Sequence, residues 1–187
     1  ALGEGGIIEG ITPSSTIFDL STTSSEIINQ ISDAARKKGI SFLDAPVSGG
    51  TEGANKGTLC VMVGGSEEIF QKYRETLELI GDKVMYCGDI GSGSICKIVN
   101  NLIGLSVNVL LSEAFTLGVK AEISPDILFD AISKSSGNTQ SMQAFPETLF
   151  KRNFEPGFQV DLAAKDVGLA TDLGRIMRIP MELSNIV

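Results

Sequence analysis

Short apolar runs alternate with amphipathic stretches along the first half of the chain. The apolar runs are IFDL at residues 17–20, SFLDAPV at 41–47, LCVMVGG at 59–65 and KVMYCG at 83–88. Runs of this length, separated by amphipathic segments, are typical of strands in βα units that form a parallel sheet with helices on its faces. The first half of the chain is therefore predicted to be an α/β unit.

Two of the segments between these runs have the spacing of amphipathic helices. In residues 26–40, the apolar residues Ile27, Ile31, Ala34 and Ala35 recur at helical intervals, and the last turn is basic. Residues 66–81 begin with an acidic first turn after a serine and end at Gly81. We predict one helix in each segment.

After Gly93 the pattern becomes helical throughout. Residues 94–120 are predicted to form one long helix of roughly 40 Å, at 1.5 Å per residue. Further helices are predicted at 126–133, 142–151 and 160–177, separated by SSGNT at 135–139 and by an NFEPGF turn at 153–158. The chain is thus predicted to divide into an α/β domain over 1–93 and an all-α domain over 94–187, which the long helix opens.

The long helix carries a polar stripe beside an apolar one. The polar stripe consists of Lys97, Asn101, Gly104, Asn108 and Ser112. The neighbouring apolar stripe consists of Ile98, Leu102, Leu105 and Val109. Such spacing places each set on one face of a helix. Spacing alone leaves two alternatives open: the polar stripe lines a cleft, or it faces solvent.

Composition excludes several classes of function. The formal net charge is −8 and no long run of lysine or arginine occurs, which argues against nucleic acid and anionic membranes as partners. The chain contains no histidine, so a Ser-His-Asp or Cys-His mechanism is excluded. Cys60, Cys87 and Cys96 form no CxxC pair, and we expect no metal site. We interpret the three cysteines as buried small apolar residues.

No targeting or membrane segment is expected. We see no apolar run that approaches the length needed to span a bilayer, and the start, ALGEGGIIEG, lacks the regions of a signal peptide. A reducing, cytoplasm-like compartment is therefore the default expectation, or the mitochondrial matrix if the source is eukaryotic.

Five motifs together resemble one known family. The motifs are DLSTT at 19–23, DAPVSGG at 44–50, GTLCVMVGG at 57–65, GSGSICKIVNN at 91–101 and KDVGLA at 165–170. They resemble, in the same order, those of the β-hydroxyacid dehydrogenase family, whose members include 3-hydroxyisobutyrate dehydrogenase and tartronate semialdehyde reductase. The combination of DAPVSGG with G-x-G-x-x-x-K-x-x-N-N is specific, whereas any one of the shorter motifs is weak. The resemblance covers most of the chain.

The resemblance implies a fold and a reaction. The α/β unit would be part of a Rossmann-type domain, followed by a helical domain that mediates a homo-oligomer, a dimer or a tetramer. The cofactor would be NAD or NADP, and the substrate a short 3-hydroxy acid or the corresponding semialdehyde. Lys97 would be the general acid/base, because the hydroxyl proton must leave as the hydride departs. Asn101, one turn further on, would hydrogen-bond the same substrate.

The DAPVSGG motif supplies the candidate carboxylate site. It follows a predicted strand, at the edge where open α/β sheets bind ligands. Ser48, Gly49 and Gly50 offer a hydroxyl and unshielded backbone N–H groups to a substrate carboxylate. The alternative is that the glycines only form a turn, and the resemblance favours binding.

Four further residues are candidates for the cofactor side of the site. By resemblance, Thr22 contacts the cofactor, and Lys165 lies near the nicotinamide and the substrate. Thr22 could also cap the following helix, and Lys165 could pair with Asp161. Asp166 interrupts the apolar line Leu162, Leu169 and Leu173, so it must be paired if it is buried, and pairing at the domain interface is favoured over direct chemistry. Phe158 would lie near the cofactor or, more simply, in the core.

A complete member of the family would begin with a glycine-rich loop that holds the pyrophosphate. We find no such strand, loop and helix here, so the chain is expected to represent part of the enzyme and to lack tight cofactor binding by itself. Two alternatives remain. 6-Phosphogluconate dehydrogenase is disfavoured because its pattern has a histidine where this chain has Asn100. A catalytically silent binding or assembly module is disfavoured because Lys97, Asn101, Lys165 and the SGG turn are all present.

Overall fold

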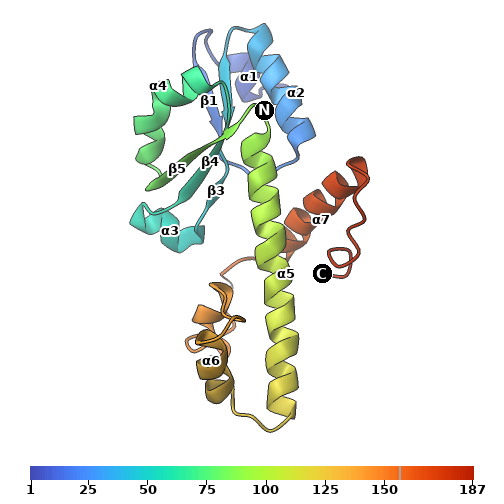
Figure 1. The fold of residues 1–187 in the computed structure, drawn as a ribbon. Coiled ribbons are helices and arrows are strands. Elements are labelled where there is room, and N and C mark those ends of the chain that lie inside the picture. Colours follow the sequence, from blue (N-terminus) through green and yellow to red (C-terminus); the bar gives the residue numbers. More distant parts are fainter. Residues whose placement is uncertain (156) are drawn as a thin grey trace.

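The computed structural model describes residues 1–155 and 157–187, so Pro156 of the predicted NFEPGF turn lies outside the described residues. The chain forms an α/β domain at one end and a smaller group of helices at the other (Figure 1). One long helix, α5 (Ser92–Lys120), runs from the first into the second. This arrangement confirms the predicted partial Rossmann-type unit followed by an all-α region.

The α/β domain contains a five-stranded sheet. The strands are β1 (Thr16–Asp19), β2 (Ser41–Asp44), β3 (Val47–Ser48), β4 (Cys60–Gly65) and β5 (Lys83–Gly88). Each predicted apolar run contains a strand, but the run at 41–47 is interrupted between β2 and β3. The interruption contains Pro46, which has no N–H to donate to a sheet.

The sheet is mixed. β1 pairs with β2, and β4 with β5, in the predicted parallel manner. β4 runs antiparallel to both β2 and β3, whereas the sequence pattern predicted a parallel sheet. Only residues 49–59 separate β3 from β4, and a parallel crossover needs about a dozen residues or more. The short connection therefore returns the chain in the opposite direction.

Helices cover both faces of the sheet. The helices of this domain are α1 (Ile7–Gly10), α2 (Ser25–Lys37), α3 (Gly50–Lys56) and α4 (Glu67–Glu78). α2 buries its apolar residues with Phe42 of β2, whereas α4 packs with the adjacent Leu43. Successive residues of a strand point to opposite faces, so α2 and α4 lie on opposite sides. α1 and α3 were not predicted, since each is too short to show helical periodicity.

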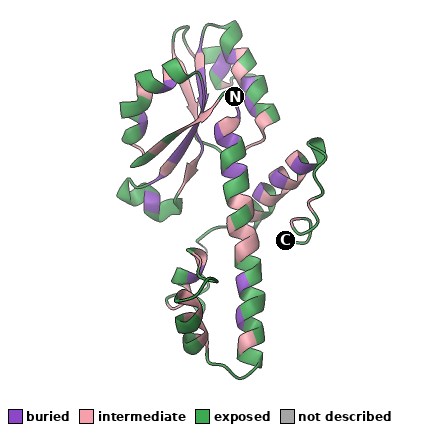
Figure 2. Cartoon of the chain, viewed as in Figure 1, coloured by how far each residue is buried: buried purple, intermediate pink, exposed green. Residues whose placement is uncertain are grey.

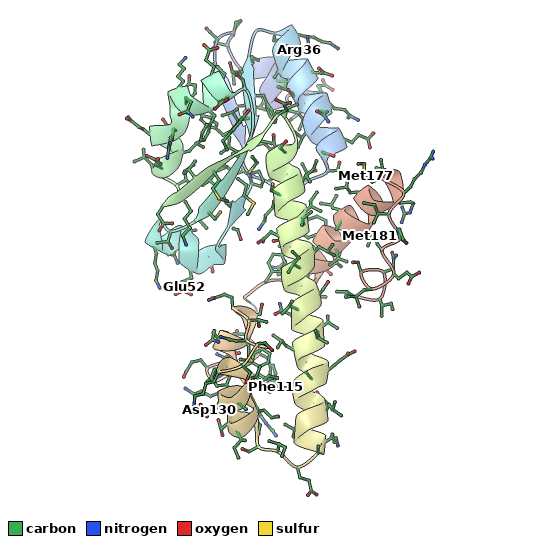
Figure 3. The ribbon with its side chains drawn as sticks, in the orientation of Figure 1. Arg36, Glu52, Phe115, Asp130, Met177 and Met181 are labelled. Carbon is green, nitrogen blue, oxygen red and sulfur yellow. The ribbon has the colours of Figure 1, made fainter. Side chains whose placement is uncertain are left out.

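The remaining helices pack along α5. They are α6 (Pro125–Ser133), a 3-10 turn η1 (Ser141–Ala144) and α7 (Val160–Ile176). α6 and η1 pack on the far half of α5, whereas α7 packs on its first half and middle, where Asp166 meets Asn101. Phe115 lies on the side of α5 that faces α6 (Figure 3). It packs edge-on against Phe145, beside the fully buried Met142. The helix predicted at 142–151 is wrong: turns follow η1, because Pro146 cannot continue a helical hydrogen-bond pattern.

α5 combines length with an apolar surface. By length and composition alone it could cross a membrane, with a mean hydropathy of 1.7 over its most apolar window, so the expectation that no apolar run reaches that length is wrong. Core helices also meet this criterion, and α5 packs against β4, α6, η1 and α7. Much of the lower half of the helix is nevertheless exposed (Figure 2).

Candidate active site

A cavity of about 480 Å³ lies where the carboxyl ends of β1 and β3 meet the first half of α5 and the segment before α7. Its walls include Thr22, the SGG turn at 48–50, Lys97, Asn101, Phe158 and Asp166. These residues come from four separate regions of the sequence. The cavity therefore brings together every predicted site residue except Lys165. Lys165 contacts two of the lining residues, Asp166 and Thr22.

Lys97 lies in the second turn of α5 and is almost completely buried, with 8% of its surface exposed. Burial lowers the pKa of its ammonium group below the ordinary lysine value of 10.5. The negative charge of Asp166 and the neighbouring Cys60 of β4 raise this pKa, whereas the positive charge of Lys165 lowers it further. Lys97 is thus a desolvated amine in the wall of a cavity, and its neutral form is more accessible than that of an exposed lysine.

A polar network links α5, α7 and the sheet domain. Asn101 Nδ2 donates to Asp166 Oδ2 over 2.6 Å. Lys165 Nζ lies 2.9 Å from Asp166 Oδ1 and donates to the backbone oxygen of Thr22 over 2.6 Å. Asp166 is 2% exposed, so its charge is buried and compensated by these neighbours. The network holds the cavity wall in a fixed arrangement.

The SGG turn connects β3 to α3 and has a conformation that glycine provides. Gly49 has φ 133° and Gly50 has φ 62°, both in the region where other residues are strained. A Cβ atom on Gly49 would also approach Leu59 Cδ2 to 3.0 Å, whereas one on Gly50 would meet open space. The first N–H groups of α3 have no partner within that helix. The turn therefore presents a hydroxyl and backbone donors at the cavity wall.

The structure decides between several sequence-based alternatives. Ser24, not Thr22, caps α2, by accepting from the N–H of Ile27. Lys165 contacts Asp166 and Thr22 in place of the Asp161 pairing considered above. Phe158 is 51% exposed and lines the cavity, so the interpretation as a core aromatic is wrong. Asp166 is buried and paired between α5 and α7, as the sequence analysis favoured.

The polar stripe of α5 faces the cavity through Lys97, Asn101, Gly104 and Asn108, whereas Ser112 lines a second cavity further along the helix. Several lining residues were not predicted as part of the site, among them Leu20, Asn100 and Ser141. Leu20 and Asn100 lie within recognised motifs, whereas Ser141 lies outside all of them.

The prediction that all three cysteines are buried is wrong. Cys60 and Cys87 are partly buried, and Cys96 is exposed. Burial and the neighbouring Cys96 thiol raise the pKa of Cys87 to about 12, so Cys87 is a thiol at neutral pH. Among the described residues, no cluster of three or more potential metal-ligating Cys, Asp or Glu side chains is found.

Comparison with known proteins identifies the family. A family profile described as "NAD-binding of NADP-dependent 3-hydroxyisobutyrate dehydrogenase" matches residues 91–187. A second profile, described as the NAD binding domain of 6-phosphogluconate dehydrogenase, matches residues 1–88. Both descriptions name nicotinamide-nucleotide binding by dehydrogenases, which agrees with a Rossmann-type sheet beside a cavity that contains a buried lysine and an SGG turn. The chain belongs to the β-hydroxyacid dehydrogenase family, and its cofactor is NAD or NADP.

Individual relatives agree with this assignment. The chain is 40% identical over 184 residues to 2-(hydroxymethyl)glutarate dehydrogenase of Eubacterium barkeri, covering 97% of this chain and 61% of the relative. It is 36% identical to 3-hydroxyisobutyrate dehydrogenase of Pseudomonas aeruginosa, covering 90% and 59%. The structure of Mycobacterium tuberculosis 3-hydroxyisobutyrate dehydrogenase with L-serine superposes with a TM-score of 0.88 at 32% identity, over 96% of this chain and 64% of that one. The chain spans about three-fifths of the length of these relatives.

The cavity is suited to the reactive end of a nicotinamide nucleotide. Leu20, Leu105 and Phe158 supply apolar surface that can cover a flat ring. The side chains of Thr22 and Asn100 supply polar groups beside that surface. Asp166 Oδ1 is buried without a well-aligned hydrogen bond, although Lys165 lies close to it, so this wall retains capacity to accept a donor. These residues fit the cofactor that the family uses.

Proposed function

We propose that the natural polypeptide containing this chain is an NAD(P)-dependent oxidoreductase that interconverts a short 3-hydroxy acid and its semialdehyde. The observation that carries the proposal is the burial of Lys97 in the same cavity as the SGG turn. A desolvated amine can exchange a proton with a substrate hydroxyl, and the turn can bind a carboxylate a few atoms away.

In this proposal Lys97 acts as the general acid/base. During oxidation its neutral amine accepts the hydroxyl proton, and during reduction its ammonium group donates that proton to the aldehyde oxygen. The nicotinamide, when bound, supplies the hydride acceptor or donor. The lowered pKa of Lys97 favours the neutral form needed for oxidation.

The substrate carboxylate is assigned to Ser48, Gly49 and Gly50. The Ser48 hydroxyl and the N–H groups of the glycines are donors on the cavity wall, where a charge-assisted hydrogen bond is shielded from water. Asn101 is assigned to the substrate as well: the contact with Asp166 fixes its Nδ2, and its Oδ1 accepts from Asn100 over 3.1 Å. Both contacts orient the amide beside Lys97.

The cofactor side is assigned to Thr22, Phe158, Lys165 and Asp166. Phe158 is half-exposed at the cavity edge, where its ring can pack on the nicotinamide. Thr22 is joined to α7 through Lys165, so cofactor binding at Thr22 and the position of Asp166 are linked. No choice between NAD and NADP is included in the proposal.

The favoured substrates resemble 3-hydroxyisobutyrate. Two of the relatives described above bear this name. The relative at 40% identity is named for 2-(hydroxymethyl)glutarate, which also has a hydroxymethyl group on the carbon that bears a carboxylate. Ser141 and Asn108, at the end of the cavity away from the sheet, are the candidates for reading the group at C2. The loop at 135–139 contributes no residue to the cavity wall.

Two further parts of the proposal concern the whole protein. We assign it to a homo-oligomer that associates through the helical region, supported by exposed apolar residues such as Leu110, Leu117 and Ile127. We also assign it to a reducing compartment, supported by the three free cysteines.

The test is an assay of the natural full-length polypeptide. 3-Hydroxyisobutyrate, 2-(hydroxymethyl)glutarate, L-serine and 6-phosphogluconate are each offered with NAD and with NADP, and reduced cofactor is followed by absorbance. Turnover of one of the first three acids supports the proposal. Oxidation of 6-phosphogluconate alone, or no turnover with any acid, rejects it, and the latter result favours the silent module.

A further inference from the structure

The carboxylate of Asp44 joins strand β2 to the first turn of α5. Asp44 is the last residue of β2 and is completely buried. Its Oδ1 accepts the N–H of Gly91 over 2.8 Å, and its Oδ2 accepts the N–H of Ser94 over 2.8 Å. The bonded residues are 47 and 50 positions apart in the sequence, and both donors belong to the start of the helix that carries Lys97.

α5 has no side-chain cap of its own. Its N-cap residue is Gly91, and its first turn contains no acidic residue. By contrast, α2, α4 and α6 each begin with a serine that accepts a backbone N–H of the first turn. Asp44 therefore supplies from another strand the acceptors that a helix N-terminus requires.

The charge of Asp44 is compensated by the helix. Among the described residues, no lysine or arginine nitrogen forms an ion pair with this carboxylate. A buried carboxylate without such a partner is costly unless it receives hydrogen bonds, and here it accepts two and lies at the positive end of a helix. Asp44 and α5 thus depend on each other energetically.

Two glycines allow this close approach. A Cβ atom on Gly64 of β4 would lie 2.5 Å from Asp44 Oδ1. A Cβ atom on Gly93 of α5 would collide with the backbone oxygen of Met62 and lie 2.9 Å from that of Asp44. The absence of side chains at both positions lets the helix start directly against the sheet, so the contact has little room for adjustment.

We propose that Asp44 is a positioning residue: by holding the start of α5 on β2, it sets the location of Lys97 relative to the SGG turn. Ser48 follows Asp44 by four residues, and Lys97 follows Ser94 by three. The two halves of the proposed site are therefore each within a few residues of one carboxylate. The inference rests on the proposed function, since it concerns the distance between the proton-transferring amine and the bound substrate.

The experiment is Asp44→Asn in the natural full-length enzyme. Asparagine keeps the volume but presents an NH₂ group to one of the two N–H donors, so one hydrogen bond becomes a repulsive contact. We expect kcat per folded molecule to fall about 10- to 100-fold, since a displacement on the order of 1 Å is enough for such a loss. KM and the affinity for cofactor should change much less, and the deuterium isotope effect on kcat should rise because hydride transfer becomes slower.

The matched control is Ser66→Ala, which removes the cap of α4, a helix that contributes no residue to the cavity wall. It should lower Tm, as Asp44→Asn should, without changing kcat per folded molecule. A crystal structure of Asp44→Asn should show the first turns of α5 moved relative to Ser48.

Normal kcat and isotope effect in folded Asp44→Asn would overturn the inference while leaving the proposed function intact. An inactive wild-type enzyme would instead reject the proposed function. In that case the crystal structure of Asp44→Asn would test whether Asp44 positions α5, and an unmoved helix would refute that role.

Discussion

Asn101 on α5 donates a hydrogen bond to Asp166 on α7 across 65 residues of sequence, over 2.6 Å. Asp166 in turn influences Lys97, because its negative charge raises the pKa that burial lowers. One buried carboxylate therefore contributes both to the orientation of the proposed substrate-binding amide and to the protonation of the proposed acid/base.

Lys97→Ala should reduce kcat at least about 100-fold, the usual contribution of a general acid/base, while the dissociation constant of the cofactor stays nearly the same. Steady-state kinetics and a fluorescence titration with reduced cofactor measure these quantities. Lys120→Ala, at the exposed end of the same helix, is the matched control and should behave as the wild type. Near-normal turnover of the Lys97 variant would refute its assigned role.

The oxidation rate should rise with pH through the pKa of Lys97, since the neutral amine is the base, and the midpoint should lie below 10.5. Asp166→Asn removes the charge that raises this pKa, so the midpoint should move to lower pH. Lys165 and Cys60, the other groups that influence Lys97, remain in place in this variant.

Asp161→Asn is the control for this shift. It removes an exposed carboxylate from the first turn of the same helix, and Asp161 does not contribute to the pKa of Lys97. The two pH profiles of kcat/KM, compared with the wild type, provide the measurement. An unchanged midpoint in Asp166→Asn would contradict the electrostatic role.

Lys165→Ala should lower the free energy of unfolding by about 1–3 kcal/mol, because it deprives the buried Asp166 carboxylate of a partner and removes the contact with Thr22. Arg175→Ala removes an exposed ion pair with Asp172 on the same helix, and should cost no more than about 0.5 kcal/mol. Urea denaturation compares the two. Equal effects would show that the Lys165 contacts are not structurally important.

Gly49→Ala should raise KM for the acid substrate about 10-fold or more, since a side chain at φ 133° distorts the turn and meets Leu59. Gly50→Ala should have a smaller effect, because φ 62° is accessible to alanine at a cost of about 1–2 kcal/mol and the space beside it is open. If both variants keep the wild-type KM, the turn is not the carboxylate site.

The sequence predicted the site residues better than the long-range contacts that position them. Lys97 and Asn101 lie in a motif, and helical spacing puts them on one face, so both could be located without coordinates. The antiparallel direction of β4 could not be inferred in the same way, because a strand's apolar pattern does not encode its direction. The connection of Asp44 to Gly91 and Ser94 depends on long-range packing, and no local pattern reports it.

The sequence-based predictions that were wrong or incomplete also have identifiable causes. The helix expected at 142–151 had suitable apolar spacing, and Pro146 outweighed it. Phe158 was expected in the core because aromatic residues are usually buried, yet it lies at the edge of a cavity whose existence depends on α5 and the sheet. Ser141 enters the same cavity through a turn that lacks periodicity altogether.

The anchoring of α5 at one end makes the helix a lever with Lys97 close to its pivot. At 1.5 Å per residue, Lys97 is about 9 Å from Gly91, whereas Lys120 is about 43 Å away. A tilt that displaces the far end by about 4 Å would therefore move Lys97 by less than about 1 Å. Small displacements at the far end of the helix would thus leave the amine of Lys97, the proposed acid/base, almost stationary.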